Sequence, residues 1–167
     1  GAGFMGSHLA EDLLKCGYRV IILDDLSGGF IENIPKSADF VEGSIENVEL
    51  VKKLFEKNKF SYVFHLGAYA AEGLSHFIRR FNYQNNVIAS VNLINGSIKN
   101  SVDKFIFASS MDVYGAQEPP FTEDMVPKPL DPYGIAKYAI EQDLDNAWRQ
   151  FGLNYTVIRP HDIIGPH

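Results

Sequence analysis

The sequence predicts an α/β fold in which helices cover both faces of a mostly parallel sheet. Short, continuous apolar runs alternate along the chain with longer stretches of helical periodicity. Continuous apolar runs are typical of strands that are buried on both faces of a parallel sheet. Because each strand-like run is followed by a helix-like stretch, we expect a doubly wound sheet with right-handed crossovers.

The expected elements follow this alternation along the whole chain. Strands are expected at residues 18–23, 40–41, 62–66, 105–108 and 155–158, and helices at residues 6–16, 48–58, 81–100 and 132–151. Gly17 stands where a helix C-cap glycine is expected, and Asn47 is a candidate N-cap for the second helix. Residues 115–132 contain five of the eight prolines, so we expect an ordered surface loop there rather than an interdomain linker.

Composition narrows the class of partner. The 167 residues fit one domain, and the formal charge of −6 argues against nucleic acid or an anionic membrane as the main partner. No apolar run in the sequence approaches the roughly 20 residues of a membrane span. The single cysteine, Cys16, excludes an internal disulfide and fits a reducing compartment, so we expect a cytoplasmic protein. The histidines show no metal-ligand spacing, and no metal is expected.

The two ends of the sequence indicate an incomplete domain. A glycine-rich loop opens the chain with no strand before it, and the chain ends just after a strand-like run. In dinucleotide-binding folds such a loop follows the first strand. We therefore expect residues 1–167 to form a dinucleotide-binding domain that is incomplete at both ends.

The opening residues match the pattern G-x-G-x-x-G at Gly1, Gly3 and Gly6. Glycine lets the backbone approach a pyrophosphate closely at the positive end of a helix dipole. Asp24 ends the next strand-like run, 18 residues after Gly6. A carboxylate there accepts the ribose hydroxyls of the adenosine and repels a 2′-phosphate, which favours NAD over NADP. The alternative is that Asp24 and Asp25 are only turn residues.

The strongest candidate for chemistry is the pair Tyr133 and Lys137, which shares one face at the start of a helix. An ammonium near a phenol favours the phenolate. Lowering a tyrosine pKa by about three units takes roughly 4 kcal/mol, which Lys137 and a nicotinamide cation together can supply. Ser110 follows the fourth strand-like run, at the edge where open α/β sheets bind ligands. Each feature alone is ordinary, but their order after a phosphate loop favours a catalytic set.

Beyond these patterns, the sequence resembles the extended short-chain dehydrogenases/reductases over essentially all of its length. The motifs that carry the resemblance are Gly3-Phe4-Met5-Gly6-Ser7-His8, Asp24 before Leu26-Ser27, Phe64-His65-Leu66, Asn85-Asn86, Ser109-Ser110 with Val113-Tyr114-Gly115, Pro132-Tyr133-Gly134-Ile135-Ala136-Lys137 and Arg159-Pro160-His161. Within that superfamily it is most similar to the NAD-dependent epimerase/dehydratase family, and to UDP-glucose 4-epimerases in particular. The resemblance implies a Rossmann fold, here without its first strand and without the C-terminal substrate domain.

The resemblance also implies roles for the matching residues. Ser110 would hydrogen-bond the sugar oxygen, Tyr133 would be the acid/base, and Lys137 would hold the nicotinamide ribose and tune Tyr133. The residues expected to contact NAD are Gly1, Gly3, Phe4, Met5, Gly6, Asp24, Asp25, Leu26, Ser27, Gly28, Ser44, Ile45, Leu66, Gly67, Ala68, Asn85, Tyr133, Lys137 and His161.

The implied reaction is 4-epimerisation of a nucleotide sugar, with a UDP-hexose as the expected substrate. Tyr133 takes the proton of the C4 hydroxyl while the hydride moves to NAD⁺. The 4-keto sugar then turns over and receives the hydride on its other face. The resemblance further implies a homodimer formed through the two long helices, at residues 81–100 and 132–151.

Several residues depart from the family pattern. Ser44 replaces an aspartate that contacts the adenine amino group, and Asp162 and Ile164 replace a common Asn and Tyr. Asp112 stands where epimerases carry a small neutral residue and 4,6-dehydratases carry an acid, although Met111 lacks the polar group that dehydratases have beside it. A 4,6-dehydratase or another extended short-chain dehydrogenase is therefore the first alternative. The second is a non-catalytic NAD-binding sensor or scaffold, which has no need of the catalytic set.

Overall fold

The computed structural model describes residues 1–165, which form an α/β fold with parallel strands. One sheet pairs β1 (Ile21–Asp24) with β2 (Asp39–Glu42), and the other has the order β3 (Tyr62–His65), β4 (Lys104–Ala108), β5 (Tyr155–Ile158). All three pairings are parallel, as the continuous apolar runs predicted. In residues 1–165, β1 and β3 are not paired, as expected for a doubly wound sheet without its first strand. The doubly wound order has one more strand between those two positions.

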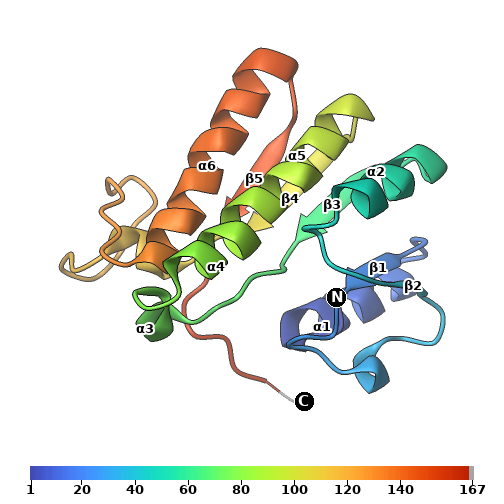
Figure 1. Ribbon diagram of the computed structural model, residues 1–167, viewed down its shortest axis with the longest axis horizontal. Helices are drawn as coiled ribbons and strands as arrows, with labels where there is room; N and C mark the ends of the chain where they lie inside the picture. Colours follow the sequence, from blue (N-terminus) through green and yellow to red (C-terminus); the bar gives the residue numbers. More distant parts are fainter. Residues whose placement is uncertain (166–167) are drawn as a thin grey trace.

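Helices pack on these strands in the order that the sequence predicted. The long ones are α1 (Phe4–Lys15), α2 (Val48–Lys57), α5 (Ala89–Lys99) and α6 (Pro132–Phe151). Helices α2, α5 and α6 lie side by side over one face of the β3–β5 sheet, while α1 lies with the β1–β2 pair (Figure 1). The chain therefore has two parts, one built around the β1–β2 pair and one around the β3–β5 sheet.

The helix expected at residues 81–100 differs in detail from the observed one. It begins earlier as α4 (Arg79–Tyr83), passes through a π-turn labelled η2 (Gln84–Ile88), and continues as α5. Each π-turn adds a residue and changes which side chains face inward, and such turns are frequent at functional sites. The sequence did not predict the short helix α3 (Glu72–Ser75) or the 3₁₀ turns η1 (Ile31–Asn33) and η3 (Met111–Tyr114).

The residues at the ends of α1 and α2 confirm the helix caps that the sequence predicted. Gly17 follows α1 with a φ of +85°, a conformation that glycine adopts without steric cost. The Asn47 side chain accepts a hydrogen bond from the Leu50 amide at 3.0 Å, which makes it the N-cap of α2. Asp131 caps α6 by accepting from the Tyr133 and Gly134 amides, at 2.8 and 2.9 Å. The Asp131 cap thus determines the residue at which α6 begins, and with it the position of Tyr133 in the first turn.

The core lies between the β3–β5 sheet and the α5–α6 layer. Phe105 and Phe107 of β4 are buried against Ile140 and Leu144 of α6. These two α6 residues share a helix face with Tyr133 and Lys137, because steps of three and four residues return to the same side. Packing of the apolar part of this face against β4 therefore also turns Tyr133 and Lys137 toward the end of β4.

Candidate active site

The glycine-rich loop folds back tightly against β1 and the turn after it. A Cβ on Gly6 would lie 2.7 Å from the Gly1 Cα, and a Cβ on Gly29 would lie 2.6 Å from the Ala2 carbonyl carbon. No side chain fits at these approaches without moving backbone. At Gly3 a Cβ would meet nothing within 4 Å. Gly3 is also the N-cap of α1, and its first turn has neither a side-chain cap nor an acidic residue. The amides of that helix end are therefore open to an anion.

Asp24 ends β1 directly beside this loop. Its Oδ2 accepts from the Ala2 amide at 2.8 Å, and its Oδ1 accepts from the Leu26 amide at 2.9 Å. Burial alone would raise the pKa of Asp24, and the hydrogen bonds from these backbone amides lower it. The carboxylate is therefore charged and held at the mouth of the loop, whereas Asp25 is exposed and bonds only within its own turn, to Ser27.

Ser110, Tyr133 and Lys137 come together at the carboxyl end of β4, as the sequence predicted from the strand end and the helix face. All three are buried, with exposed fractions of 8%, 8% and 3%. The Lys137 Nζ donates to the Ala108 carbonyl at 2.7 Å and lies 5.7 Å from the centre of the Tyr133 ring. Lys137 thus ties the first turns of α6 to the last residue of β4, beside the two hydroxyl groups.

The electrostatics of this cluster favour the protonated phenol when no cofactor is bound. Burial and then the negative charge of Asp112 raise the pKa of Tyr133 to about 12, although the nearby Ser110 hydroxyl lowers it in part. Burial lowers the pKa of Lys137 to about 7, so only part of the Lys137 amine is protonated at neutral pH. Lys137 alone therefore does not make Tyr133 a base here, and a further positive charge is needed, as the sequence argument required.

A buried polar chain behind the catalytic cluster was not predicted. His65 bonds the Ser90 hydroxyl at 2.7 Å, and that hydroxyl donates to the Asn86 carbonyl at 2.8 Å. The Asn86 side chain bonds both backbone groups of Tyr69, at 2.8 and 3.1 Å, and donates to Asn82 at 2.8 Å. The π-turn faces Asn86 inward and leaves Asn85, the predicted contact, donating to the Phe81 carbonyl of its own helix.

His65 stays neutral in this chain of contacts. Burial first, and then the charge of Lys137, lower the pKa of His65 to about 3. The histidine is thus a satisfied buried side chain. Among residues 1–165, no group of three or more His, Cys, Asp or Glu side chains is placed to hold a metal ion.

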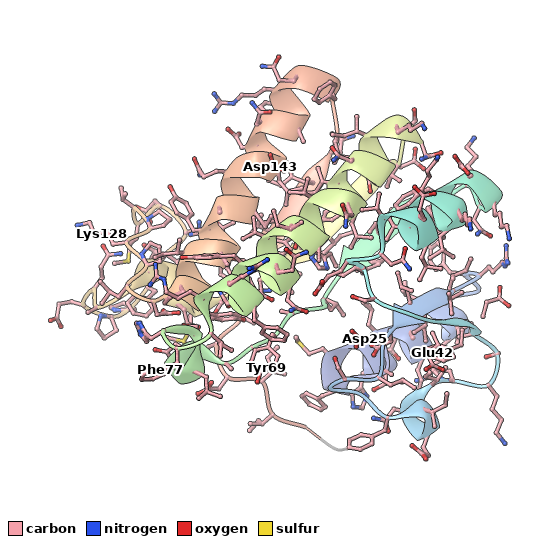
Figure 2. The ribbon with its side chains drawn as sticks, viewed as in Figure 1. Asp25, Glu42, Tyr69, Phe77, Lys128 and Asp143 are labelled. Carbon is pink, nitrogen blue, oxygen red and sulfur yellow. The ribbon has the colours of Figure 1, made fainter. Side chains whose placement is uncertain are left out.

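The remaining predicted contact residues lie in the first turn of α1 and on the segments that follow β1, β2, β3 and β5. Phe4 and Met5 lie in the first turn of α1, and Ser44 accepts from the Glu46 amide at 3.1 Å. Gly67, Ala68, Ser27, Gly28 and His161 are exposed, whereas Leu26, Ile45 and Leu66 are half-buried. Tyr69 follows Ala68 and lies in the lower middle of Figure 2, with Asp25 labelled to its right.

An ion pair between Glu141 and Arg159 lies next to Ser109, the residue before Ser110. The Glu141 carboxylate accepts from Arg159 at 2.6 and 3.0 Å, and it also accepts from the Ser109 hydroxyl. A third nitrogen of the Arg159 guanidinium donates to the Tyr114 hydroxyl at 2.9 Å, and its bonds to Glu141 raise the pKa of Arg159. One cluster therefore links α6, β5, η3 and the residue before Ser110.

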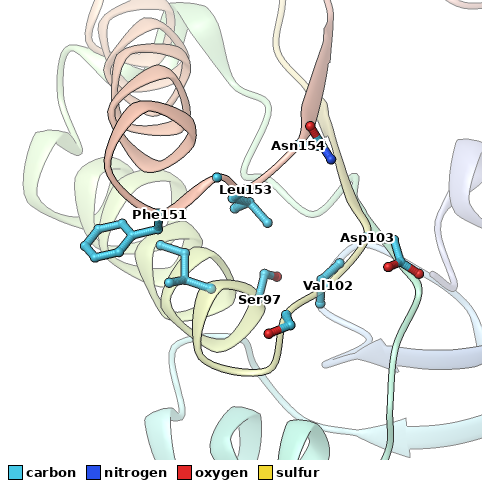
Figure 3. A pocket seen from close by; sticks show the side chains of 9 residues that line it. Ser97, Val102, Asp103, Phe151, Leu153 and Asn154 are labelled. Atoms are coloured by element: carbon cyan, nitrogen blue, oxygen red, sulfur yellow. The ribbon is translucent and has the colours of Figure 1, made fainter.

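A cavity of about 300 Å³ lies away from these residues (Figure 3). It is lined by the last turn of α5, the loop at Val102 and Asp103, and the residues from Phe151 to Asn154 after α6. At 1.5 Å per residue, α6 separates Phe151 from Tyr133 by roughly 27 Å. The cavity is therefore at the opposite end of the sheet from the catalytic cluster. In the described part of the chain, no helix is both long enough and apolar enough to cross a membrane.

A helix end open to an anion and a Tyr–Lys pair at the same edge of a parallel α/β fold define a dinucleotide-binding domain of the short-chain dehydrogenase/reductase type. Comparison with known families agrees, since the chain matches the NAD dependent epimerase/dehydratase family over residues 1–167. The chain belongs to this family.

Individual relatives cover the chain almost completely. It is 33% identical to a UDP-glucose 4-epimerase of Azospirillum brasilense over 99% of this chain and 48% of the relative. Among solved structures, a UDP-glucose 4-epimerase of Thermotoga maritima with UDP-glucose is 42% identical, with a TM-score of 0.92 over 95% of this chain and 52% of that chain. A Thermus thermophilus UDP-glucose 4-epimerase in complex with NAD is 31% identical, with a TM-score of 0.90 over the same shares. The chain thus spans about half the length of these relatives.

Proposed function

We propose that the protein is an NAD-dependent 4-epimerase of nucleotide sugars that interconverts UDP-glucose and UDP-galactose. The observation that carries the proposal is the buried cluster of Ser110, Tyr133 and Lys137, in a chain that also has an open helix end at Gly3. A pure binding domain has no need of a buried lysine whose amine reaches the end of β4 next to a phenol. The names and bound molecules of the similar structures support the same conclusion.

The residues present fit an NAD molecule across the carboxyl edge of the strands. The close approaches at Gly1, Gly6 and Gly29 leave no room for side chains, while the α1 amides beyond Gly3 are open to a pyrophosphate. Asp24 presents a charged carboxylate for the adenosine ribose. When bound, NAD⁺ supplies the hydride acceptor and a positive charge near the phenol.

In the proposed reaction, this chain binds the sugar and moves one proton. Ser110 and Tyr133 hold the C4 hydroxyl, and Tyr133 accepts its proton as the C4–H bond breaks. Lys137 holds the nicotinamide ribose and favours the phenolate. Of the remaining predicted contacts, we assign Ser44 and Ile45 to the adenine side and Leu66 to Ala68 to the strip below the cofactor. Asn85 and His161 are assigned to the nicotinamide side.

The direct test is a chromatographic assay of the full-length protein with UDP-glucose and with UDP-galactose. We expect each sugar to yield the other, with no net production of NADH. A 4-keto-6-deoxy sugar as product would instead identify a 4,6-dehydratase. Tight NAD binding with no change in either sugar would identify a sensor or scaffold.

The dehydratase is the second candidate because of one observation. Asp112 lies within hydrogen-bond distance of Ser110, with its carboxylate Oδ2 2.8 Å from the serine hydroxyl. An acid at that place suits elimination of water from the sugar. Against it, the adjacent Met111 offers no polar group, so the epimerase remains the function that the site supports better.

Asp24 makes the cofactor preference testable. We expect Asp24→Asn to weaken NAD⁺ binding by roughly 10- to 100-fold, because a charged acceptor for the ribose hydroxyls is lost. The ratio of NADP⁺ to NAD⁺ affinity should rise, since the carboxylate no longer repels a 2′-phosphate. Isothermal titration with both cofactors measures this, with Asp12→Ala on the exposed face of α1 as the control. Unchanged NAD⁺ affinity in Asp24→Asn would contradict the assignment.

We further propose that the protein is a cytoplasmic homodimer. Support for the dimer comes from exposed apolar side chains on the two long helices, with Phe81, Ile88 and Trp148 each about half exposed. Support for the compartment is the lone, reduced Cys16. Sedimentation equilibrium of the full-length protein is expected to give twice the chain mass, and a monomeric mass would exclude the dimer.

A further inference from the structure

Asp112 belongs to the catalytic cluster by geometry as well as by sequence. The Ser110 hydroxyl donates to the Asp112 Oδ2 at 2.8 Å, and the Asp112 amide donates back to the Ser110 Oγ at 3.1 Å. A Cβ on Gly134 would lie 2.8 Å from the Asp112 carbonyl oxygen, so η3 packs directly on the first turn of α6. The Asp112 carboxylate is thus fixed beside Ser110, on the turn that contacts the residue following Tyr133.

Counting protons shows which group donates the hydrogen bond between Ser110 and Asp112. A serine hydroxyl has one proton and two lone pairs, while a carboxylate only accepts. The proton between Ser110 and Asp112 must therefore come from Ser110. One lone pair of Ser110 is then taken by the Asp112 amide. The other can only receive a proton, which means that the next partner of Ser110 must be a donor.

We propose that Asp112 is a positioning residue that holds the Ser110 proton and so withholds it from the sugar oxygen and from Tyr133. The proposal rests on the epimerase function and deepens it. The C4 hydroxyl has one proton, which it gives to Tyr133, so Ser110 can bond the C4 oxygen only as a donor. Ser110 must therefore leave Asp112 to stabilise the 4-keto sugar, and Asp112 opposes that step.

The other charges around the phenol are held in place by different partners. Asp131 also raises the pKa of Tyr133, but its carboxylate is committed to the helix amides that it caps. The Lys137 amine is bound to the Ala108 carbonyl, and His65 beside it is neutral. Asp112 is accordingly the carboxylate whose removal tests the cluster without uncapping α6.

The test follows the Tyr133 phenol itself by NMR in full-length protein saturated with NAD⁺ and free of sugar. Tyrosine labelled with ¹³C at Cζ is titrated with pH, and the Tyr133 signal is assigned by its loss in Tyr133→Phe. Asp112→Asn removes the charge but keeps an acceptor oxygen, and we expect the titration midpoint to fall by about one pH unit. Asp112→Ala also frees the Ser110 proton to donate to the phenolate, so its midpoint should fall further.

The two variants are then repeated in a Ser110→Ala background, where we expect the extra fall in Asp112→Ala to vanish. Equal midpoints for Asp112→Asn and Asp112→Ala would overturn the proposal, and so would an extra fall that persists without Ser110. Asp124→Ala is the matched control, because that carboxylate is exposed and contacts only Thr122 on the surface loop. If circular dichroism shows that Asp112→Ala does not fold, Asp112→Leu replaces it, since leucine also lacks an acceptor.

Addition of UDP-glucose separates this proposal from the epimerase function. We expect the fraction of bound nicotinamide in the reduced form to be several-fold higher in Asp112→Ala than in the parent, because the ketone gains a donor. A parent protein that does not interconvert UDP-glucose and UDP-galactose refutes the epimerase function. The NMR titration, which uses no sugar, still decides the role of Asp112 in that case.

Discussion

Replacing Tyr133 by phenylalanine is expected to lower the epimerase turnover number by about 10²- to 10⁴-fold, the ordinary contribution of a positioned acid/base. The phenol is buried on the α6 face that meets Ser110, and its ring lies 5.7 Å from the Lys137 amine. Phenylalanine keeps the ring and its packing but cannot accept the sugar proton. We therefore expect the affinity for NAD⁺, measured by isothermal titration, to change by only a few-fold.

The control for this variant lies on the same helix. Tyr138→Phe removes a hydroxyl five residues further along α6, from a half-buried side chain outside the catalytic cluster. Its turnover should stay close to that of the parent. Full turnover by Tyr133→Phe, measured by product formation from UDP-glucose, would show that another group carries the proton.

Replacing Glu141 by alanine is expected to lower the free energy of unfolding by about 3 kcal/mol, because it leaves the Arg159 charge without its partner. The Glu141 side chain is 6% exposed and accepts from Arg159 twice and from Ser109 once. Loss of a buried partner is costly, whereas exchange of both partners for apolar residues is often nearly neutral. The double variant Glu141→Leu with Arg159→Leu should therefore lose less than Glu141→Ala. Urea denaturation of the full-length protein compares both variants with the parent.

A second ion pair on α6 provides the comparison. Asp145 and Arg149 are 2.9 Å apart, but the Arg149 side chain is 65% exposed. Such pairs contribute about 0.3–0.5 kcal/mol, so Asp145→Ala should change the free energy of unfolding only slightly. Equal losses in Asp145→Ala and Glu141→Ala would refute the view that burial makes the Glu141 contact important.

Local patterns predicted the features that depend on neighbours in the sequence. The bounds of β5 and α6 match the expected residues 155–158 and 132–151. Asn47 and Gly17 act as the predicted caps because a cap needs only the adjacent turn. Tyr133 and Lys137 could be paired because four residues return to the same helix face.

Features that depend on the tertiary structure could not be predicted from the sequence. The inward-facing asparagine is Asn86, because the π-turn shifts the helix register in a way that no apolar periodicity shows. Glu141 and Arg159 meet across 18 residues of sequence. The raised pKa of Tyr133 depends on burial and on Asp112 in the neighbouring turn. The sequence therefore predicted which residues meet at the site, but not the charges that they feel there.

UDP-glucose deuterated at C4 shows whether a hydride leaves and returns to the same sugar carbon while Tyr133 takes the proton. Mass spectrometry and NMR of the product locate the label after many turnovers of the NAD⁺-loaded, full-length protein. We expect UDP-galactose with the deuterium retained at C4. Deuterium found at C6 or lost to water would rule out this route.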